Sequence, residues 1–453
     1  MEIIEKQRIH KLNDYDFTSG NYVLYWMHLS QRVQYNHSLV YAASLAENLK
    51  LPLLVFFGLT DNYPEANLRH YQFMLEGLAE TSRELKKRNI KMIVWIIDPV
   101  QGVISLSEDA AAVVTDFGYL KVSKDWLSRA AQVIKTKFEA VESNVIVPVE
   151  TASVKEEYAA ATFRPKMMKL INLYLSKLKD VKVSRSSLDF KLKGVDLNCT
   201  DLILRELKID TSVSSVDWIK GGTSKAVKLL NSFIKNKLHE YPEKRNHPSL
   251  DFSSHMSPYL HFGQISPVYI ALKVLGTESP GRDVFLEELI IRRELSFNFV
   301  YYNKEYDSIN SLPNWAMESL LKHESDHREI LYTKIEFEKA QTHDKYWNAA
   351  QNELVSTGKM HNYMRMYWGK KIIEWTEGPD SAYEYMIYFN NKYALDGRDP
   401  NSYAGIAWCL GKHDRPWGER AIFGMIRYMN DKGLERKFDM IPYVKKYTVS
   451  DEK

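Results

Sequence analysis

Three tryptophans within one short stretch of the chain could carry electrons. Trp347, Trp368 and Trp375 lie in the segment 345–375, and Arg365 shares a predicted helix with the last two. An indole ring can be oxidised, so a row of indoles that leads to an arginine–aspartate pair could bring an electron to a buried cofactor. Aromatic core packing is the ordinary alternative, because most tryptophans in proteins serve it. The rest of the chain must decide between these two interpretations.

The helix expected over 358–377 sets the spacing of this group. Trp368 and Trp375 are seven residues apart, two turns along one face, so their rings should stand roughly 10 Å apart along the helix axis. Arg365 precedes Trp368 by three residues and lies close to the same face. Since a buried guanidinium needs a carboxylate partner, we expect Asp396, in an acidic turn further along the chain, to pair with it.

An acidic pair interrupts the amphipathic helix expected over 285–303. Glu287 and Glu288 are followed by Arg292, and one interpretation is an ordinary surface pair between Glu288 and Arg292, which are four residues apart. The other interpretation is a carboxyl group in a cavity, where burial raises its pKa so that it can donate a hydrogen bond.

Two further segments could bind phosphate groups. In 252–266, Ser253, Ser254 and Ser257 precede an aromatic helical run; hydroxyls and free backbone N–H groups at a helix start bind phosphate, although such serines more often only cap helices. The run 413–438 interleaves basic and aromatic side chains, which suits either nucleic-acid binding or the solvated basic face of a helix. Its members are Arg415, Trp417, Arg420, Phe423, Arg427, Tyr428, Lys432, Arg436 and Lys437.

The elements that must position these residues fall into two halves. In the first half, apolar runs of strand length alternate with helical patterns such as 67–88, which predicts a doubly wound parallel five-stranded sheet. The predicted strands are 22–28, 51–59, 91–98, 111–118 and 145–150. No GxGxxG follows the first strand, so a dinucleotide site of the usual kind is not expected there.

Helical periodicity dominates the second half. Strand signals almost vanish after Trp218, and the helical pattern continues to about residue 430, so this half is predicted to be all-α. The stretch between the halves has no period and is rich in serine and charge, which is typical of a linker or of a long surface loop. We therefore expect an α/β domain over 20–177, a linker over 178–215 and a helical domain over 216–448.

Composition narrows the class of protein. The 453 residues are 45% apolar and 26% charged, as in ordinary globular proteins, and a net charge of +3 means that any nucleic-acid binding must depend on a local patch. Cys199 and Cys409 are too few for a disulfide framework and lie in no metal-binding pattern. With no signal-peptide pattern and no stretch of membrane-spanning length, we expect a soluble intracellular protein.

Ordered blocks along nearly the whole chain resemble the photolyase/cryptochrome superfamily, and within it the class II cyclobutane pyrimidine dimer photolyases. The blocks are YWMHLSQRVQYNHSL (25–39), LRHYQFMLEGL (68–78), VTDFGYL (114–120), EYAAATFRPK (157–166), SPYLHFGQIS (257–266), EELIIRREL (287–295), STGKMHNYMRMYW (356–368), DGRDPNSYAGIAW (396–408) and GERAIFGMIRYMN (418–430). Their order agrees with the α/β half followed by the helical half.

The resemblance implies that the helical domain holds FAD. Arg365 and Asp396 match the family's salt bridge beside the isoalloxazine, and Asn390 matches the class II residue that faces flavin N5. The class II photoreduction chain is matched by Trp347, Trp368 and Trp375. The other positions that match cofactor contacts are Tyr241, Ser253, Ser254, His255, Met256, Ser257, Gly397 and Asp399.

Other positions match residues on the DNA side of the family's site. Glu288 matches the carboxyl that hydrogen-bonds the dimer's carbonyl oxygens, while Trp417 and Arg427 match residues that fill or brace the gap left by a flipped dimer. The remaining lesion-side positions are Arg245, Asn246, Arg292, Met366 and Trp408. Arg292 stands where certain members of the family carry a tryptophan that faces the lesion.

The activity that the resemblance implies is light-driven DNA repair by a carbon–carbon lyase. Reduced FAD, once excited, would donate an electron to a dimer flipped out of double-stranded DNA, and the cyclobutane ring would then split. The α/β domain would hold an antenna chromophore, a deazaflavin or a folate, if one is present, and the protein would be a monomer. The alternatives are a cryptochrome-like photoreceptor without repair activity and, more distantly, a light-independent nucleotide-binding protein.

Overall fold

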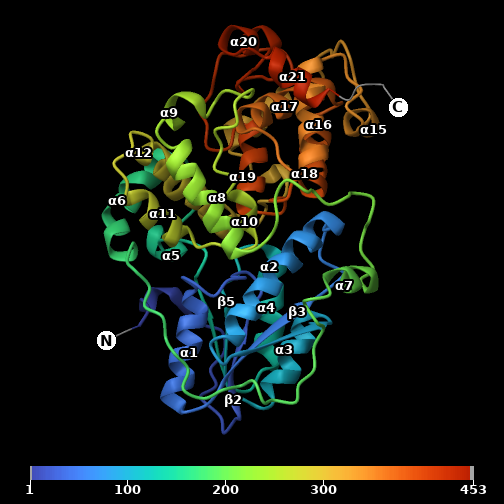
Figure 1. The fold of residues 1–453 in the computed structure, drawn as a ribbon. Coiled ribbons are helices and arrows are strands. Elements are labelled where there is room, and N and C mark those ends of the chain that lie inside the picture. The colour runs from blue at the N-terminus through green and yellow to red at the C-terminus, as the bar shows by residue number, and fades with distance from the viewer. Residues whose placement is uncertain (1–2, 449–453) are drawn as a thin grey trace. The chain divides into compact units, whose positions relative to one another are not determined.

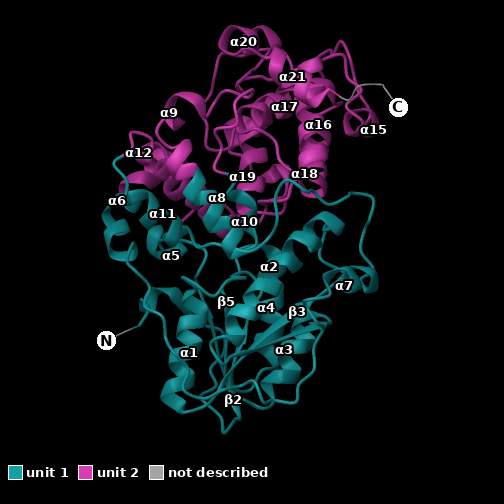
Figure 2. Ribbon diagram, viewed as in Figure 1, with its two compact units in different colours: residues 1–154, 166–232, 255–278 teal, residues 155–165, 233–254, 279–453 magenta. Residues whose placement is uncertain are grey.

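The computed structural model describes residues 3–448, which divide into two units (Figure 2). The first unit takes residues up to 154 together with 166–232 and 255–278, and the second takes 155–165, 233–254 and the chain from 279 onward. The chain therefore passes between the units several times, which differs from the simple succession of domain, linker and domain that the sequence suggests.

The stretch expected to be a linker packs on the first unit. Val195 N donates to Val94 O (2.9 Å), and Lys91 N donates to Ser187 Oγ (2.7 Å). Ser187 is fully buried. Because an edge strand presents unpaired backbone groups, this segment covers the edge of the sheet instead of spanning open solvent.

The first unit contains a six-stranded sheet with the order β1-β6-β5-β2-β3-β4. Figure 1 labels β2, β3 and β5 of this sheet. Its strands are β1 (Ile9–Lys11), β2 (Tyr22–Trp26), β3 (Leu53–Leu59), β4 (Lys91–Ile96), β5 (Ala110–Asp116) and β6 (Lys137–Val141). Strands β2 to β6 pair in parallel, with Val23 opposite Leu53, whereas β1 pairs antiparallel with β6. The doubly wound sheet is thus confirmed, with one antiparallel edge strand beyond the five expected.

The strand expected at 145–150 is wrong. Residues 145–147 are buried, but the Arg8 guanidinium binds their backbone, with Nη1 donating to Val145 O (3.2 Å) and Nη2 to Ile146 O (2.6 Å). Pro148 then starts a short helix, Val149–Ala152. A buried apolar run resembles a strand in sequence even when a side chain takes its carbonyl bonds, and the fifth parallel strand is instead β6.

Helices cover both faces of this sheet. Within β2, Val23 and Tyr25 pack into one apolar cluster with α1, α2 and α7, while Tyr22, Leu24 and Trp26 pack into a second cluster with α3 and α4. Burial of alternate residues on opposite faces explains why the strand sequences are continuously apolar. The helices of this unit are α1 (His37–Leu49), α2 (Leu68–Lys86), α3 (Pro99–Ser107), α4 (Lys121–Val133), α5 (Val149–Ala152), α7 (Thr200–Glu206), α10 (Ser257–His261) and α11 (Pro267–Leu275), with the 3₁₀ turn η1 (Lys6–Arg8). The division between the units falls within α6 (Ala160–Tyr174) and α8 (Thr223–Asn236).

The second unit is helical. Its elements are α9 (Tyr241–Lys244), α12 (Arg282–Leu286), η2 (Glu287–Arg292), α13 (Arg293–Tyr302), η3 (Ile309–Ser311), α14 (Asn314–Lys322), α15 (Lys334–Glu338), α16 (Lys345–Thr357), α17 (Asn362–Trp375), α18 (Pro379–Tyr393), α19 (Pro400–Cys409), α20 (Asp431–Lys437) and α21 (Ile441–Tyr447). The helix expected over 358–377 is shorter, because Gly358 adopts a left-handed conformation (φ 72°) that ends α16. His361 then caps α17 by accepting from Tyr363 N.

Among the described residues, no helix is both long and apolar enough to cross a membrane. Cys199 is exposed, Cys409 is buried, and both are free thiols.

Candidate functional site

The three tryptophans form a continuous row. Trp347 of α16 lies between the two indoles of α17, with its ring centroid 6.4 Å from that of Trp368 and 6.3 Å from that of Trp375. All three side chains are buried. Trp347 Nε1 donates to Trp368 O (3.0 Å), and Trp368 Nε1 donates to Gln351 Oε1 (2.8 Å). The gap expected between Trp368 and Trp375 along one helix is therefore bridged by a ring from another helix.

Asp344 fixes the position of the central ring. Its carboxylate caps α16 by accepting from Tyr346 N (2.8 Å) and Trp347 N (3.1 Å), and it also accepts the hydroxyl hydrogen bond of Tyr367 on α17. Burial and the neighbouring carboxylate raise the pKa of Tyr367, so this phenol stays a neutral donor. One carboxylate thus sets both the start of α16 and its contact with α17.

The row continues outward from Trp375. Tyr332 and His343 contact Trp375 with ring centroids 5.7 and 4.8 Å away, and Tyr332 Oη lies 2.7 Å from His343 Nδ1. His343 is exposed and Tyr332 is partly exposed, so the aromatic contacts lead from buried Trp368 to the surface. No sequence pattern singled out Tyr332 or His343, because both belong to irregular segments that only folding brings to Trp375.

The predicted Arg365–Asp396 ion pair is not formed. Both side chains are half-buried, and neither has a hydrogen-bond or ion-pair partner among the described residues. Asn390 of α18 is buried, and its Nδ2 lies 3.4 Å from Asn391 Oδ1. The expected ion pair is thus wrong for this structure. The polar groups of Arg365, Asp396 and Asn390 could instead contact a bound molecule.

The turn after Asp396 is tight and locally capped. A Cβ on Gly397 would lie 2.8 Å from Asn390 O and 2.9 Å from Asn391 Cα, so only glycine fits the approach to α18. Asp399 Oδ1 caps α19 by accepting from Asn401 N (2.9 Å). Both residues therefore have structural roles in addition to the cofactor contacts predicted for them.

Glu288 pairs with an arginine that the sequence analysis did not assign to it. Arg245 Nη1 lies 2.8 Å from Glu288 Oε1, and the Glu288 side chain is 35% exposed. The expected surface pair between Glu288 and Arg292 is wrong, because Arg292 Nε lies 3.5 Å from Glu287 instead. Arg164 also binds Glu287 through two nitrogens (3.0 and 2.6 Å) and holds the pKa of this carboxyl below its usual range.

The backbone explains this exchange of partners. Residues 287–292 form the π-helical segment η2 between α12 and α13. A π turn shifts side chains off the regular i,i+4 spacing, and such turns often mark functional sites. Beside Glu288, the Arg245 guanidinium lies 5.6 Å from the centroid of Tyr241, whose pKa is raised mainly by burial.

The remaining lesion-side residues are partly brought together. The Arg292 guanidinium lies over the ring of Trp408, 5.3 Å from its centroid, which is a cation–π contact. Arg292 is the position at which certain members of the family carry a tryptophan. Met366 of α17 contacts Cys409 of α19, with their sulfur atoms 3.9 Å apart. Asn246 is exposed, and the structure gives it no side-chain contact with these residues.

The run 413–438, whose sequence suits either a nucleic-acid-binding face or a solvated basic helix face, is irregular over residues 414–427, and we call this hairpin the 414–427 loop. Arg420 and Gly424 pair across it as an antiparallel bridge. Trp417 is 38% exposed, and the guanidinium of Arg427 lies 4.7 Å from its ring centroid. Only residues 431–437 of the predicted run are helical, because Gly424 (φ 50°) and Ile422 (φ 67°) adopt left-handed conformations that interrupt a helix.

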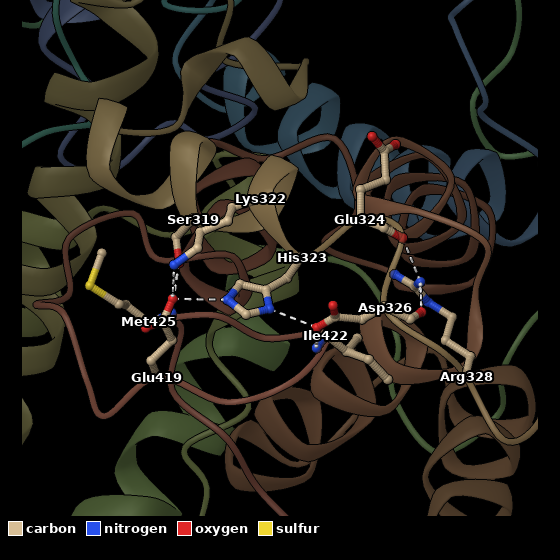
Figure 3. Close-up of polar contacts among 9 residues, drawn as sticks. All are labelled: Ser319, Lys322, His323, Glu324, Asp326, Arg328, Glu419, Ile422 and Met425. Carbon is tan, nitrogen blue, oxygen red and sulfur yellow. Dashed lines mark hydrogen bonds and ion pairs between the residues drawn. The ribbon is translucent and has the colours of Figure 1, made fainter.

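Residues 323–327 match HExxH, the pattern of a zinc-protease helix. They follow α14 as a turn rather than lying on one helix face, and both ring nitrogens of His323 face carboxylates (Figure 3). Within residues 3–448, no group of His, Cys, Asp and Glu could hold a metal ion. The sequence match to HExxH therefore does not indicate a zinc site in these residues.

The serine segment is divided between the units. Ser253 and Ser254 belong to the second unit, while His255, Met256 and Ser257 belong to the first. Within the first unit, His255 (φ 57°) packs against Trp218 with ring centroids 5.1 Å apart, and Met256 is buried.

The first unit has a polar cluster at the carboxyl end of its central strands. Strand β2 lies between β3 and β5, where the chain reverses direction across the sheet, the usual ligand position in such sheets. Trp26 Nε1 and His28 Nε2 are buried there without partners. Burial lowers the pKa of His28, so its ring is neutral.

Comparison with known proteins identifies the family. Residues 23–182 match the family DNA photolyase. A deoxyribodipyrimidine photo-lyase from Methanothermobacter thermautotrophicus is 48% identical over 443 residues, which cover 98% of each chain. The protein of the same name from Potorous tridactylus is 39% identical over 437 residues, covering 94% of this chain and 81% of its own.

Solved structures agree on the fold. A bacterial class III photolyase from Agrobacterium tumefaciens has a TM-score of 0.74 at 18% identity and covers 95% of this chain and 87% of its own. A cryptochrome from Synechocystis has a TM-score of 0.75 at 15% identity, covering 94% and 88%. The chain therefore belongs to the photolyase/cryptochrome family. Its curated relatives show it to be an enzyme of the photolyase type, and the family implies bound FAD.

Proposed function

We propose that this protein repairs cyclobutane pyrimidine dimers in DNA, using light and reduced FAD, as a class II photolyase. The observation that carries the proposal is the row Trp368–Trp347–Trp375, which runs from the core of the helical unit toward exposed His343. Three adjoining indoles on two helices give an oxidisable path between the interior and the surface.

The residues of α17–α19 fit a flavin. Arg365 and Asp396 are half-buried without protein partners and offer one positive and one negative group, and Asn390 adds a buried amide. FAD bound there would supply an electron donor when it is illuminated. The protein's own contribution is to orient these groups and exclude water.

Glu288 and Arg245 would hold the lesion. An ionised carboxylate paired with arginine accepts hydrogen bonds and cannot donate them, so Glu288 must take up a proton to donate to a carbonyl oxygen of the dimer. Arg245 can donate without such a change. The Arg292–Trp408 pair would provide a flat surface for the extruded bases, and Trp417 with Arg427 would occupy the gap in the duplex.

An antenna chromophore, if present, would bind at the carboxyl end of β2 in the first unit. The unpartnered Trp26 Nε1 and His28 Nε2 support this placement, since buried polar groups normally have partners. A solved archaeal photolyase from Sulfolobus tokodaii contains two FAD molecules, which imply a novel light-harvesting cofactor in that protein. It has a TM-score of 0.71 at 18% identity and covers 94% of this chain and 89% of its own.

The decisive experiment is an absorption spectrum of the purified protein, followed by illumination with an oligonucleotide that contains a single dimer. We expect a flavin spectrum and light-dependent loss of the dimer, with no loss in the dark. A flavin-bearing protein that leaves the dimer intact after chemical reduction would favour the cryptochrome-like photoreceptor, and a colourless preparation that cannot be reconstituted with FAD would reject both.

A further inference from the structure

The 414–427 loop, which carries Trp417 and Arg427, is attached to the end of α14 by a small polar network (Figure 3). His323 Nε2 lies 3.0 Å from Glu419 Oε1 in the loop, and His323 Nδ1 lies 2.6 Å from Asp326 Oδ2. Asp326 Oδ2 in turn accepts from Ile422 N (2.8 Å). A single imidazole therefore contacts the loop directly and through one carboxylate.

The geometry requires a charged ring. Carboxylates accept hydrogen bonds and a neutral imidazole has only one N–H, so both contacts of His323 are hydrogen bonds only when the ring carries two protons. Such charge-assisted bonds are stronger than neutral ones.

Other contacts also hold the middle of the loop: Arg420 and Gly424 exchange two backbone hydrogen bonds (2.9 and 2.7 Å), and Phe423 and Ile426 are buried. Ile422 is β-branched and adopts φ 67°, an unfavourable conformation that persists only where surrounding contacts impose it. Gly424 packs so closely that a Cβ there would lie 2.1 Å from Ser319 Oγ and 2.9 Å from His323 Cδ2. Met425 N donates to Ser319 Oγ (2.7 Å), which adds one neutral bond on the far side of the turn.

We propose that protonated His323 is a positioning residue that holds the 414–427 loop in the conformation in which Trp417 and Arg427 meet damaged DNA. The inference rests on the proposed repair function and adds to it a dependence of damage recognition on pH. His323 itself touches neither Trp417 nor Arg427, and it acts through Glu419 and through the backbone of Ile422.

The charges around His323 favour its protonated form. Glu419 and Asp326 are the two carboxylates that face the ring, and they raise the pKa of His323. Lys322 binds Glu419 (2.7 Å), which lowers the pKa of that carboxyl, while Arg328 binds the backbone carbonyl of Asp326 (3.0 Å). A raised pKa means that the contribution of His323 is complete below the pKa of an unfolded histidine, and it is lost as pH rises through the folded value.

Hydrogen exchange of the FAD-loaded protein without DNA tests the attachment. Protection of the amides in 417–427, corrected for intrinsic exchange rates, is measured at about pH 6.5 and about two units higher. We expect wild-type protection to fall about three- to tenfold at the higher pH. His323→Gln should be weakly protected at both values, and Glu419→Gln should lose protection at a lower pH than wild type. His239→Gln, which changes an exposed histidine of the same unit, should behave as wild type.

The affinity for DNA, measured in darkness at the same two pH values, tests the consequence. The ratio of affinities for dimer-containing and intact duplex should fall with loop protection in wild type and stay flat in His323→Gln. Protection independent of pH in wild type, or a wild-type response in His323→Gln, would overturn the proposal, as would lost protection with an unchanged ratio. A protein that prefers damaged DNA at neither pH would reject the proposed function instead, and the exchange data would still decide whether His323 holds the loop.

Discussion

Trp347 is the residue on which the row of indoles depends, because its ring contacts both Trp368 and Trp375. Its indole N–H is satisfied by Trp368 O, so the ring is held in place by the helix that carries the other two members.

Substituting Trp347 should therefore interrupt electron transfer without unfolding the unit. We expect Trp347→Phe to slow photoreduction of oxidised flavin by more than about tenfold, which corresponds to about 1.4 kcal/mol of barrier, while chemically reduced protein still repairs dimers. Laser-flash absorption gives the rate. Trp315→Phe is the matched control, because Trp315 hydrogen-bonds to Tyr158 and contacts none of the three; equal rates in the two variants would exclude the row.

Glu288 and Arg245 give a second prediction at the residue scale. Glu288→Ala should lower the repair yield per photon several-fold with a smaller loss of DNA affinity, because a hydrogen bond to a group that gains negative charge is worth about 1.5–3 kcal/mol. Glu288→Gln should retain most of the yield, since its amide donates without taking up a proton. If both variants repaired as well as wild type, Glu288 would serve only to pair Arg245.

Among the elements, α21 is anchored to α16 by one buried carboxylate. Glu353 accepts from His361 N (2.9 Å), Tyr443 Oη (2.7 Å) and Tyr447 Oη (3.3 Å). Burial raises the pKa of Glu353 in spite of these bonds, because desolvation penalises the charged form.

Two substitutions separate the bonds of Glu353 from its charge. Glu353→Ala should cost about 1–3 kcal/mol of unfolding free energy, because the buried Tyr443 hydroxyl loses its acceptor. For wild type, the contribution of Glu353 is complete below the unfolded glutamate pKa, about 4.3, and declines as pH rises through the raised folded value. Relative to wild type, Glu353→Gln should therefore gain stability over that window, as measured by urea unfolding at several pH values. Exposed Glu329→Gln should show no such trend, and a parallel shift in both variants would refute this assignment.

Over the whole molecule, charge does not attract DNA to this chain. The 61 basic and 58 acidic residues leave a net charge of +3, so long-range steering is weak. Affinity must arise from local groups, of which Arg415, Arg420 and Arg427 are all exposed on the 414–427 loop.

The division into two units predicts how flavin removal spreads through the molecule. Arg365, Asn390 and Asp396 all belong to the second unit, so binding should stabilise that unit, by about 4 kcal/mol at a thousandfold excess over the dissociation constant. Hydrogen exchange with and without FAD should show lost protection in α16–α19 and little change in β2–β6. Equal losses in both sets of peptides would mean that the two units unfold as one.

Local sequence signals are enough to predict the two halves of the fold and most of the candidate residues. Continuous apolar runs identify β2 to β5, since strands buried on both faces must be apolar at every position, and helical periodicity identifies α2 and the helical unit. These are local signals. The residue types that could carry electrons or bind DNA can likewise be identified from the sequence, because only a few kinds of side chain are oxidisable, charged or aromatic.

Which of these residues contact one another depends on how the elements pack. Trp347 reaches Trp368 from another helix, Glu288 takes Arg245 because a π turn breaks the expected spacing, and Arg365 does not pair with Asp396. Arg8, more than a hundred residues away in sequence, binds the backbone of Val145 and Ile146 in place of a neighbouring strand. His323 joins α14 to a loop whose sequence suits either a nucleic-acid-binding face or a basic helix face. Each outcome depends on a contact between segments that are distant in the sequence. Such a contact leaves no periodicity or residue spacing from which it could be predicted.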